Sequence, residues 1–353
     1  MQNFNEKIQD TLRAKKINAF LITDINNIYY LTGFTGSSGF CLITAKSKHF
    51  FTDFRYVEQA EQEVSGWTLN IEKGKRIDVL RKFIKKNAIN NLAFETSISF
   101  LFYTALKALK IPLKALNGLV ENLRKHKNDM EIDLIKLAYK RAENAFLDIK
   151  RFIKKGAKES HIALRLENAL KNQGCKKIPF DIIVASGVNS SKPHATVSDK
   201  VLQGGDLITI DWGGENKGYY SDMTRTFLIQ GKDIERKSEI YNIVNKARDK
   251  AINAIKIGVK AKNIDSVARK YITDKGYGDY FGHGLGHGIG LLAHEEPRIN
   301  KISTEILTNG MVFTIEPGIY IREFGGVRIE DTVVINNDKI EILNNLPTKL
   351  EIL

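Results

Sequence analysis

His-Gly-Leu-Gly-His-Gly-Ile-Gly-Leu-Leu-Ala-His-Glu-Glu-Pro occupies residues 283–297 and contains three of the seven histidines of the chain. Four glycines lie between and just after the first two histidines. Glycine is unfavourable inside helices because it loses the most backbone freedom on folding. We therefore expect extended or loop backbone that another group approaches closely. Imidazoles on such a backbone suit a metal, a substrate or both. A glycine-rich turn with scattered histidines is the alternative that this stretch alone leaves open.

Two aspartates lie in segments that carry the residues typical of strands. Asp211 ends a β-branched run at 206–213, and Asp222 lies in the aromatic and β-branched run 218–229. If the turn between them closes around Asn216 and Lys217, the two aspartates face each other directly. Like charges at that spacing are destabilising unless a cation or a shared proton lies between them. A pair of metal ions is the solution that we expect.

Two glutamates add to this set. Glu316 closes the apolar run 311–318, where an unpaired buried carboxylate would be costly. Glu330 lies in 326–335, and strand alternation places Arg328, Glu330 and Thr332 on one face and Asp331 on the other. Two Asp, one His and two Glu favour a dinuclear Mn, Co, Zn or Fe site over a structural zinc, which prefers Cys and His.

The chain resembles the pita-bread metallopeptidases. The resemblance lies in five residues, taken in order with their neighbours: Asp211, Asp222, His287, Glu316 and Glu330. This family includes methionyl aminopeptidase, Xaa-Pro aminopeptidase and Xaa-Pro dipeptidase (prolidase). The matching motifs span residues 194–331, and segments 27–34, 52–56 and 123–132 resemble the proline-specific branch. The resemblance implies an α+β pita-bread (creatinase/aminopeptidase) catalytic domain at 125–353, preceded by a smaller α/β creatinase-like domain at 1–124.

The resemblance also implies a role for each ligand. Asp211 would chelate one metal ion, Asp222 and Glu330 would bridge two, and His287 and Glu316 would complete the second. Manganese is the first choice of metal, with cobalt, zinc or iron as alternatives. A water between the ions would be the nucleophile, with its pKa lowered as in metal-bound water generally. Glu316 would be the general base, so no Ser or Cys nucleophile is required.

Further residues form an expected outer shell, again by resemblance. His294 would stabilise the tetrahedral intermediate, and His194 would lie near the scissile peptide nitrogen. His283 would line the site for the residue after the cleaved bond. Tyr320 would line the substrate side, and Arg328 would hold Asp211 or a substrate carboxylate. The alternative for each of them is a buried polar group with a structural role.

Composition agrees with a soluble protein of two domains. The chain has 353 residues, 42% hydrophobic and 27% charged, with no apolar run of the ~20 residues that a membrane helix needs. The N-terminus lacks a signal-peptide pattern, and Cys41 and Cys175 form no disulfide framework. We therefore expect a cytoplasmic protein. The net charge of +13 is spread along the chain as dispersed Lys, so we expect no nucleic-acid partner.

Periodicity and capping residues predict the secondary structure. In residues 1–124 we expect a helix at 7–19, strands at 19–23, 40–44 and 49–53, and a helix from about residue 54. In the remainder we expect helices at 129–152, 159–173 (ending at Gly174), 235–256 and 261–275. Antiparallel strands with helices on one side should carry the Asp, His and Glu residues.

The sequence thus predicts a metal-dependent exopeptidase that cleaves a bond before proline. Xaa-Pro aminopeptidase activity on peptides with proline in second position is preferred, with prolidase as the alternative and a homodimer expected. Methionyl aminopeptidase is disfavoured by His283 and by the N-terminal domain. A peptide-binding relative without catalysis, or a metal-free creatine hydrolase, would leave the complete ligand set unexplained.

Overall fold

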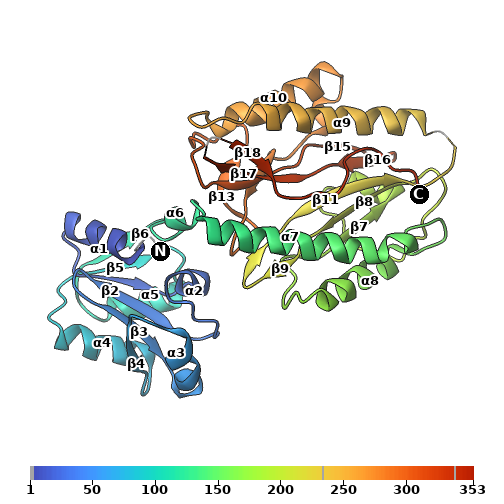
Figure 1. Cartoon of the computed structure of the whole chain (residues 1–353). Helices are drawn as coiled ribbons and strands as arrows, with labels where there is room; N and C mark the ends of the chain where they lie inside the picture. The colour runs from blue at the N-terminus through green and yellow to red at the C-terminus, as the bar shows by residue number, and fades with distance from the viewer. Residues whose placement is uncertain (1–3, 233, 338) are drawn as a thin grey trace. The chain divides into compact units, whose positions relative to one another are not determined.

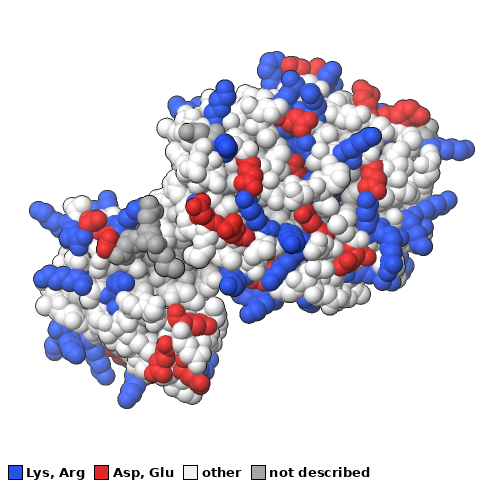
Figure 2. Space-filling view, in the orientation of Figure 1, with Lys and Arg blue, Asp and Glu red and all other residues white. Residues whose placement is uncertain are grey.

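The computed structural model describes residues 4–232, 234–337 and 339–353. The chain divides into two compact units, Met1–Arg124 and Lys125–Leu353, called here the N-terminal and C-terminal units (Figure 1). None of the helices that the structure describes combines the length and apolar composition that a bilayer crossing requires. On the face drawn in Figure 2, Lys and Arg side chains lie scattered among Asp and Glu, as the dispersed charge of the sequence predicts.

The N-terminal unit is an α/β layer built on one six-stranded sheet with the order β4-β3-β2-β1-β5-β6. Strands β1–β2 and β2–β3 pair antiparallel, and the other three pairs are parallel. Its elements are α1 (Phe4–Ala14), β1 (Ala19–Ile22), α2 (Ile25–Thr32), β2 (Phe40–Thr44), β3 (Lys48–Thr52), α3 (Val57–Glu63), β4 (Thr68–Ile71), α4 (Arg76–Lys86), β5 (Leu92–Glu95), α5 (Phe100–Lys107), β6 (Leu113–Leu116) and α6 (Glu121–Arg124).

Both faces of this sheet are buried by helices. Along β1, Phe20 and Ile22 pack with residues of α1, α2 and α3, whereas Ala19 and Leu21 pack with residues of α4 and α5. Successive strand side chains point to opposite faces, so a strand covered on both sides is apolar throughout. This is why the run at 19–22 shows no alternation in the sequence, and the expected sheet with flanking helices is confirmed.

The first helix departs from its predicted bounds. We expected residues 7–19, but α1 spans Phe4–Ala14 and Ala19 already belongs to β1. Lys16 adopts a left-handed backbone conformation with φ of 52°, and the Ile17 N–H donates to the Leu12 carbonyl at 2.9 Å. This arrangement ends a helix by bonding its last free carbonyls, and here a lysine takes the place usually filled by glycine.

A buried carboxylate organises the ends of β1 and β5. Glu95 accepts hydrogen bonds from the Thr23 and Asp24 N–H groups at 2.6 and 2.9 Å and from Asn27 Nδ2 at 2.7 Å. Burial raises the pKa of Glu95 to about 7, although these hydrogen bonds oppose the shift. The folded N-terminal unit therefore favours the protonated acid.

A pH-dependent stability is expected from the raised pKa of Glu95. The folded pKa of about 7 exceeds the ordinary value of 4.5. The contribution of this group is therefore complete below about pH 4.5 and is lost as the pH rises through 7. Glu95→Gln mimics the protonated acid at every pH, so we expect this variant not to lose stability as the pH rises. Urea unfolding at pH 5, 6, 7 and 8 should show the wild type falling relative to the variant by up to ~3 kcal/mol. Parallel pH dependences of the two proteins would contradict this assignment.

The C-terminal unit is an α+β domain in which two helix pairs cover antiparallel sheets. In Figure 1, α7 with α8 and α9 with α10 lie along opposite edges of this unit. The elements are α7 (Asp129–Ile149), α8 (Glu159–Asn172), β7 (Ile183–Ser186), β8 (Leu207–Trp212), β9 (Glu215–Asn216), β10 (Tyr219–Tyr220), β11 (Met223–Leu228), α9 (Glu235–Asn253), α10 (Ala261–Asp274), β12 (Gly286–Gly288), β13 (Glu295–Ile299), β14 (Val312–Ile315), β15 (Gly318–Ile321), β16 (Gly325–Arg328), β17 (Asp331–Asn336) and β18 (Lys339–Ile342).

The four helices expected in this unit are present with their predicted first residues. Their last residues fall one to three positions earlier than expected, and 3₁₀ turns such as Lys150–Phe152 account for part of the difference. Gly174 lies just after α8 with φ of 90°, and the Cys175 N–H donates to the Leu170 carbonyl. The predicted glycine stop of that helix is confirmed.

Strand alternation separates an apolar face from a polar one. Phe146 of α7 stacks on Trp212 of β8 and Phe227 of β11, at ring centroid distances of 4.8 and 5.4 Å. Asp211 is one position from Trp212 in β8, and Thr224 is three positions from Phe227 in β11. Both spacings are odd, so the side chains of Asp211 and Thr224 point to the opposite face of the sheet. The helices therefore cover one face, and the other face is available for chemistry.

The hairpin of Asp211 and Asp222 has a different register from the one we expected. Asn216 pairs with Tyr219, so the turn is Lys217-Gly218 and Asp211 pairs with Thr224. Both turn residues have positive φ, 47° and 79°, which is the requirement of the tightest antiparallel turns. The prediction of directly opposed aspartates is therefore wrong. The register differs by two positions, and because the side-chain period is also two, both aspartates stay on one face.

Candidate active site

A pocket of about 650 Å³ lies in the C-terminal unit on the polar face of its strands. The ten residues expected from the sequence to bind metal or substrate all line it: His194, Asp211, Asp222, His283, His287, His294, Glu316, Tyr320, Arg328 and Glu330. They come from segments that lie more than a hundred residues apart in the chain. The structure thus brings the whole predicted set to one cavity.

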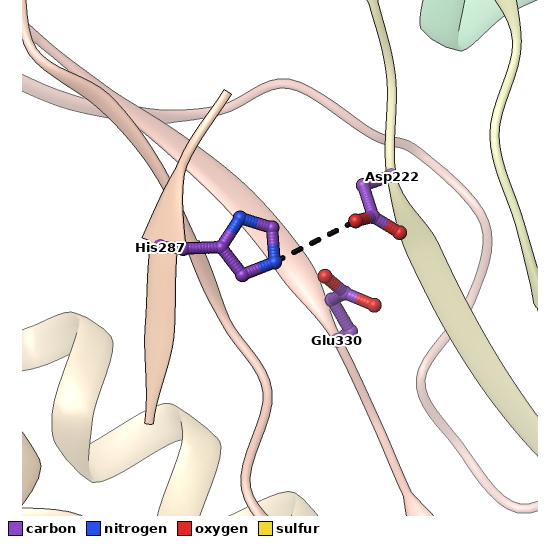
Figure 3. A group of neighbouring side chains, drawn as sticks. All are labelled: Asp222, His287 and Glu330. Carbon is purple, nitrogen blue, oxygen red and sulfur yellow. Dashed lines mark ion pairs between the residues drawn. The ribbon is translucent and has the colours of Figure 1, made fainter. Parts of the chain in front are cut away.

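Three side chains meet at the base of this pocket. Asp222 precedes β11, His287 lies on β12, and Glu330 lies between β16 and β17; all three are buried. One potential ligand atom from each lies within 4.8 Å of the other two, and the three side chains point toward one another in Figure 3. His287 Nε2 is 3.6 Å from Asp222 Oδ2 and 3.3 Å from Glu316 Oε1. Such spacing leaves room for a cation among the four groups.

The glycines beside His287 allow neighbouring backbone to approach this point. A Cβ on Gly286 would lie 1.9 Å from the Thr314 carbonyl oxygen, and one on Gly288 would lie 2.1 Å from that of Glu296. Strand β12 is held between β13 and β14 at these positions. We expected an extended backbone that another group approaches closely, and this is confirmed. The groups that approach it are the backbones of the adjacent strands.

The imidazole of His287 is arranged to offer a lone pair. Its Nδ1 lies 3.1 Å from the Gly288 carbonyl oxygen, which can only accept, so Nδ1 carries the hydrogen and Nε2 is free. Burial lowers the pKa of His287 to about 3, with a smaller contribution from the neighbouring His294. The ring is therefore neutral at neutral pH, with its acceptor nitrogen directed at the carboxylates.

The carboxylates crowd negative charge in a buried place. Burial, followed by the charge of Glu330, raises the pKa of Asp222 well above its usual range; burial, followed by the charge of Glu316, does the same for Glu330. Burial raises the pKa of Glu316 to about 8. Among the described residues, Asp211 Oδ1 and Glu330 Oε1 are buried acceptors without a hydrogen-bond partner. Carboxyl oxygens without a partner, beside a neutral imidazole, form a donor set that fits divalent cations.

Arg328 fixes the position of Asp211. Its Nη2 donates to Asp211 Oδ2 at 2.6 Å, and the same side chain donates to Tyr320 Oη at 2.8 Å and to the Pro193 carbonyl at 3.1 Å. The guanidinium is buried, and charge-assisted hydrogen bonds of this kind are strong. Of the two roles expected for Arg328, the geometry matches that of holding Asp211. The other oxygen of Asp211, Oδ1, has no hydrogen-bond partner among the described residues.

The remaining histidines line the wall. His283 lies 3.0 Å from Tyr320 Oη through Nε2 and 2.7 Å from the Gly284 carbonyl through Nδ1, and burial lowers its pKa to about 4. The ring centroid of His294 lies 4.1 Å from that of His287. His194 and His294 are the more exposed members of the group. A substrate in the pocket could therefore reach both.

Two residues of the site were missed in the sequence. Thr224 donates to Glu330 Oε2 at 2.7 Å and accepts from Arg328 Nε at 3.0 Å, which links the two predicted ligand segments. Its position two residues after Asp222 was the available signal. Arg298 lines the pocket, and its guanidinium has no hydrogen-bond or ion-pair partner among the described residues. An isolated arginine next to a proline carries no sequence signal of its own.

The fold and this site define a metallopeptidase. Residues 133–337 match metallopeptidase family M24, and residues 5–126 match the creatinase/prolidase N-terminal domain. The chain belongs to metallopeptidase family M24, and the expected family, its proline-specific branch and the fold class are confirmed.

Similar proteins cover the whole chain. The Xaa-Pro dipeptidase of Pyrococcus horikoshii is 38% identical over 96% of both chains. A solved structure of an Xaa-Pro dipeptidase from Bacillus anthracis is 41% identical, with a TM-score of 0.96 over 99% of both chains. The crystal structure of an X-Pro aminopeptidase from Thermotoga maritima is 37% identical, with a TM-score of 0.90 over 99% of both.

Proposed function

We propose that this metallopeptidase hydrolyses the peptide bond between an N-terminal residue and the proline after it. The observation that carries the proposal is the convergence of Asp211, Asp222, His287, Glu316 and Glu330 at the base of one pocket. The proline specificity is supported by the activities for which relatives 37–41% identical along the whole chain are named. His283 and Tyr320 in the wall offer a surface for the proline ring.

We propose two divalent ions at the base, with manganese as the first choice and cobalt, zinc or iron as alternatives. Asp211 and Asp222 would hold one ion, His287 and Glu316 the other, and Asp222 and Glu330 would contact both. The orphaned oxygens of Asp211 and Glu330 support this donor set. When bound, the ions supply Lewis-acid activation of water and of the scissile carbonyl. Metal analysis of protein purified without chelators tests the metal identity.

The side chains of this chain position the substrate and carry protons. Glu316 can accept a proton from the attacking water and return it to the leaving proline nitrogen. His294 and His194 are both exposed in the pocket. His294 can donate a hydrogen bond to the carbonyl oxygen of the peptide as charge develops there, and His194 would lie near the scissile peptide nitrogen. Arg328 and Thr224 keep Asp211 and Glu330 in place during this sequence.

Three peptides test the proposed function. With Mn²⁺ we expect cleavage of Gly-Pro, of Gly-Pro-Pro, or of both, and no release of Met from Met-Ala-Ser. Release of Met alone would show methionyl aminopeptidase activity and reject the proposal. No cleavage with any divalent metal would favour the binding relative, or the creatine hydrolase if creatine is consumed.

The two proline-specific activities differ in the group on the carboxyl side of the proline. The sequence favoured aminopeptidase activity, whereas the dipeptidase names of similar proteins favour the dipeptide. Arg298 gives this choice a physical basis, because a dipeptide carries its carboxylate directly on the proline. The guanidinium of Arg298 lines the pocket without a partner among the described residues and can receive that carboxylate. We therefore propose dipeptides as the preferred substrates, and longer peptides are the other outcome of the test.

Arg298→Gln separates the two activities. For a dipeptidase we expect the KM for Gly-Pro to rise on the order of 10- to 10²-fold, the worth of a hydrogen bond to a charged group. The KM for the neutral Gly-Pro amide should stay unchanged. Steady-state kinetics with both substrates provide the measurement, and Arg322→Gln, at an exposed arginine, is the control. Equal effects on the two substrates would remove Arg298 from carboxylate recognition and favour the aminopeptidase.

Two further expectations stay proposals. We propose a homodimer, which sedimentation at several protein concentrations can test. We also propose a cytoplasmic location, supported by Cys41 and Cys175, which are both free and buried. Fractionation of cells that express the tagged chain tests the location.

A further inference from the structure

Glu159 is a completely buried carboxylate outside the pocket. It is the first residue of α8, and no arginine or lysine among the described residues donates to it. Its Oε1 accepts from the Ser186 N–H at 2.6 Å and from Ser186 Oγ at 2.7 Å. Its Oε2 accepts from Ser198 Oγ at 2.6 Å and from Asn189 Nδ2 at 3.1 Å. Burying a carboxyl group is costly unless each of its hydrogen-bond partners is held in place.

All these donors belong to one segment, residues 186–198. Ser186 is the last residue of β7, Asn189 lies in the 3₁₀ turn after it, and Ser198 lies where the chain returns to α8. At that return, the Ser160 N–H donates to the Ser198 carbonyl at 2.9 Å. The carboxylate of Glu159 therefore joins the beginning and the end of the segment, and so fixes the path between them.

His194 lies in the middle of this segment and lines the active-site pocket. Its ring has no hydrogen-bond partner among the residues that the structure describes, so its backbone must set its position. The preceding residue, Pro193, is tied to the site by Arg328, which donates to its carbonyl at 3.1 Å. The segment is thus held by Arg328 from the pocket side and by Glu159 from behind.

We propose that Glu159 is a positioning residue that acts through His194. Its carboxylate closes the 186–198 segment and thereby directs the imidazole at the substrate. The metal donors lie on other segments, so this role is separate from metal binding. The kinetic part of the inference rests on the proposed Xaa-Pro hydrolysis, in which His194 contacts the peptide.

A double-mutant cycle with Glu159→Gln and His194→Ala tests the coupling. The Gln amide presents an N–H₂ group to Ser and Asn donors, which should displace the segment and lower kcat/KM on the order of 10- to 10²-fold. In the His194→Ala background, the same change should alter kcat/KM by less than about twofold. If the two substitutions act independently, their effects on kcat/KM multiply in the double variant, and this result would overturn the inference.

Glu143→Gln is the matched control. Glu143 is also buried, lies on α7, and accepts the backbone N–H groups of Asn345 and Leu346, so it anchors another segment of the same unit. We expect any kinetic effect of this change to multiply with that of His194→Ala. Titration with Mn²⁺ should give the same affinity for Glu159→Gln as for the wild type. A lost metal affinity would show that Glu159 acts through the ligands, and would also overturn the inference.

A second readout does not depend on turnover. The chain has only seven histidines, so NMR spectra of a histidine-labelled chain contain few ring signals, and comparison with His194→Ala assigns the signal of His194. Glu159→Gln should shift or broaden that signal and leave those of His283 and His287 in place. An unchanged His194 signal contradicts the inference even if the protein proves to have another activity. If Glu159→Gln does not fold, Ser198→Ala removes one donor to the same carboxylate and should produce the same shift.

Discussion

Asp222→Asn should abolish hydrolysis and leave the folded protein at least as stable as the metal-free wild type. Asp222 is buried among Glu330, Asp211 and Glu316, and this burial and crowding raise its pKa well above the usual range. Asparagine has the same shape without the charge, so it relieves repulsion in the absence of metal. It also removes a donor shared by both proposed ions, and we expect a loss of about 10³-fold or more in kcat/KM.

Thermal unfolding with and without Mn²⁺ separates these effects. A ligand at 100 times its Kd stabilises the folded state by ~2.7 kcal/mol. The wild type should show this stabilisation and Asp222→Asn should not. Asp274→Asn, at an exposed aspartate paired with Lys270, is the control and should respond as the wild type does. Full metal stabilisation together with wild-type turnover in Asp222→Asn would remove the residue from the metal site.

Glu316→Gln should slow the chemical step while much of the bound metal remains. The side chain keeps an oxygen that can accept from Thr314 and face His287, but it can no longer take a proton. The expected loss in kcat is roughly 10²–10⁴-fold, the usual worth of a general base. The KM should change far less, because the amide has nearly the same size as the carboxylate.

Metal analysis beside the kinetics identifies the cause of that loss. Glu131→Gln is a suitable control because Glu131 is also buried in the C-terminal unit, where it caps α7 and accepts from Tyr219. It should retain both the metal and the turnover number. If Glu316→Gln turns over at the wild-type rate, another group carries the proton, and His294 would be the next residue to test.

Much of this site was predictable because its signals are local. The glycines beside His287, the Asp at the end of a β-branched run and the Glu before a Pro-Gly stop each depend on near neighbours. The alternation that separates Arg328 and Glu330 from Asp331 is also a property of a few consecutive residues. In the structure Arg328 and Glu330 both contact Thr224, whereas Asp331 pairs with Arg225 and Arg248.

Other features depended on the conformation of a turn or on residues far apart in the chain. The register of Asp211 and Asp222 was set by a left-handed turn at Lys217-Gly218, which strand propensity does not reveal. Arg298 had no signal because its importance comes from the cavity around it. The same is true of Glu159, which in the sequence resembles any charged residue at the start of a helix.

The amino-acid sequence by itself determined which side chains could bind metal, on which strand faces they lie and where the helices of the catalytic part begin. These properties depend on backbone periodicity and on the chemistry of single residues. Only the tertiary structure decided which buried oxygens of Asp211 and Glu330 have no partner among the described residues and which residues hold the segment of His194. Those facts depend on distances of a few ångströms between elements distant in sequence, and packing of the whole unit sets such distances.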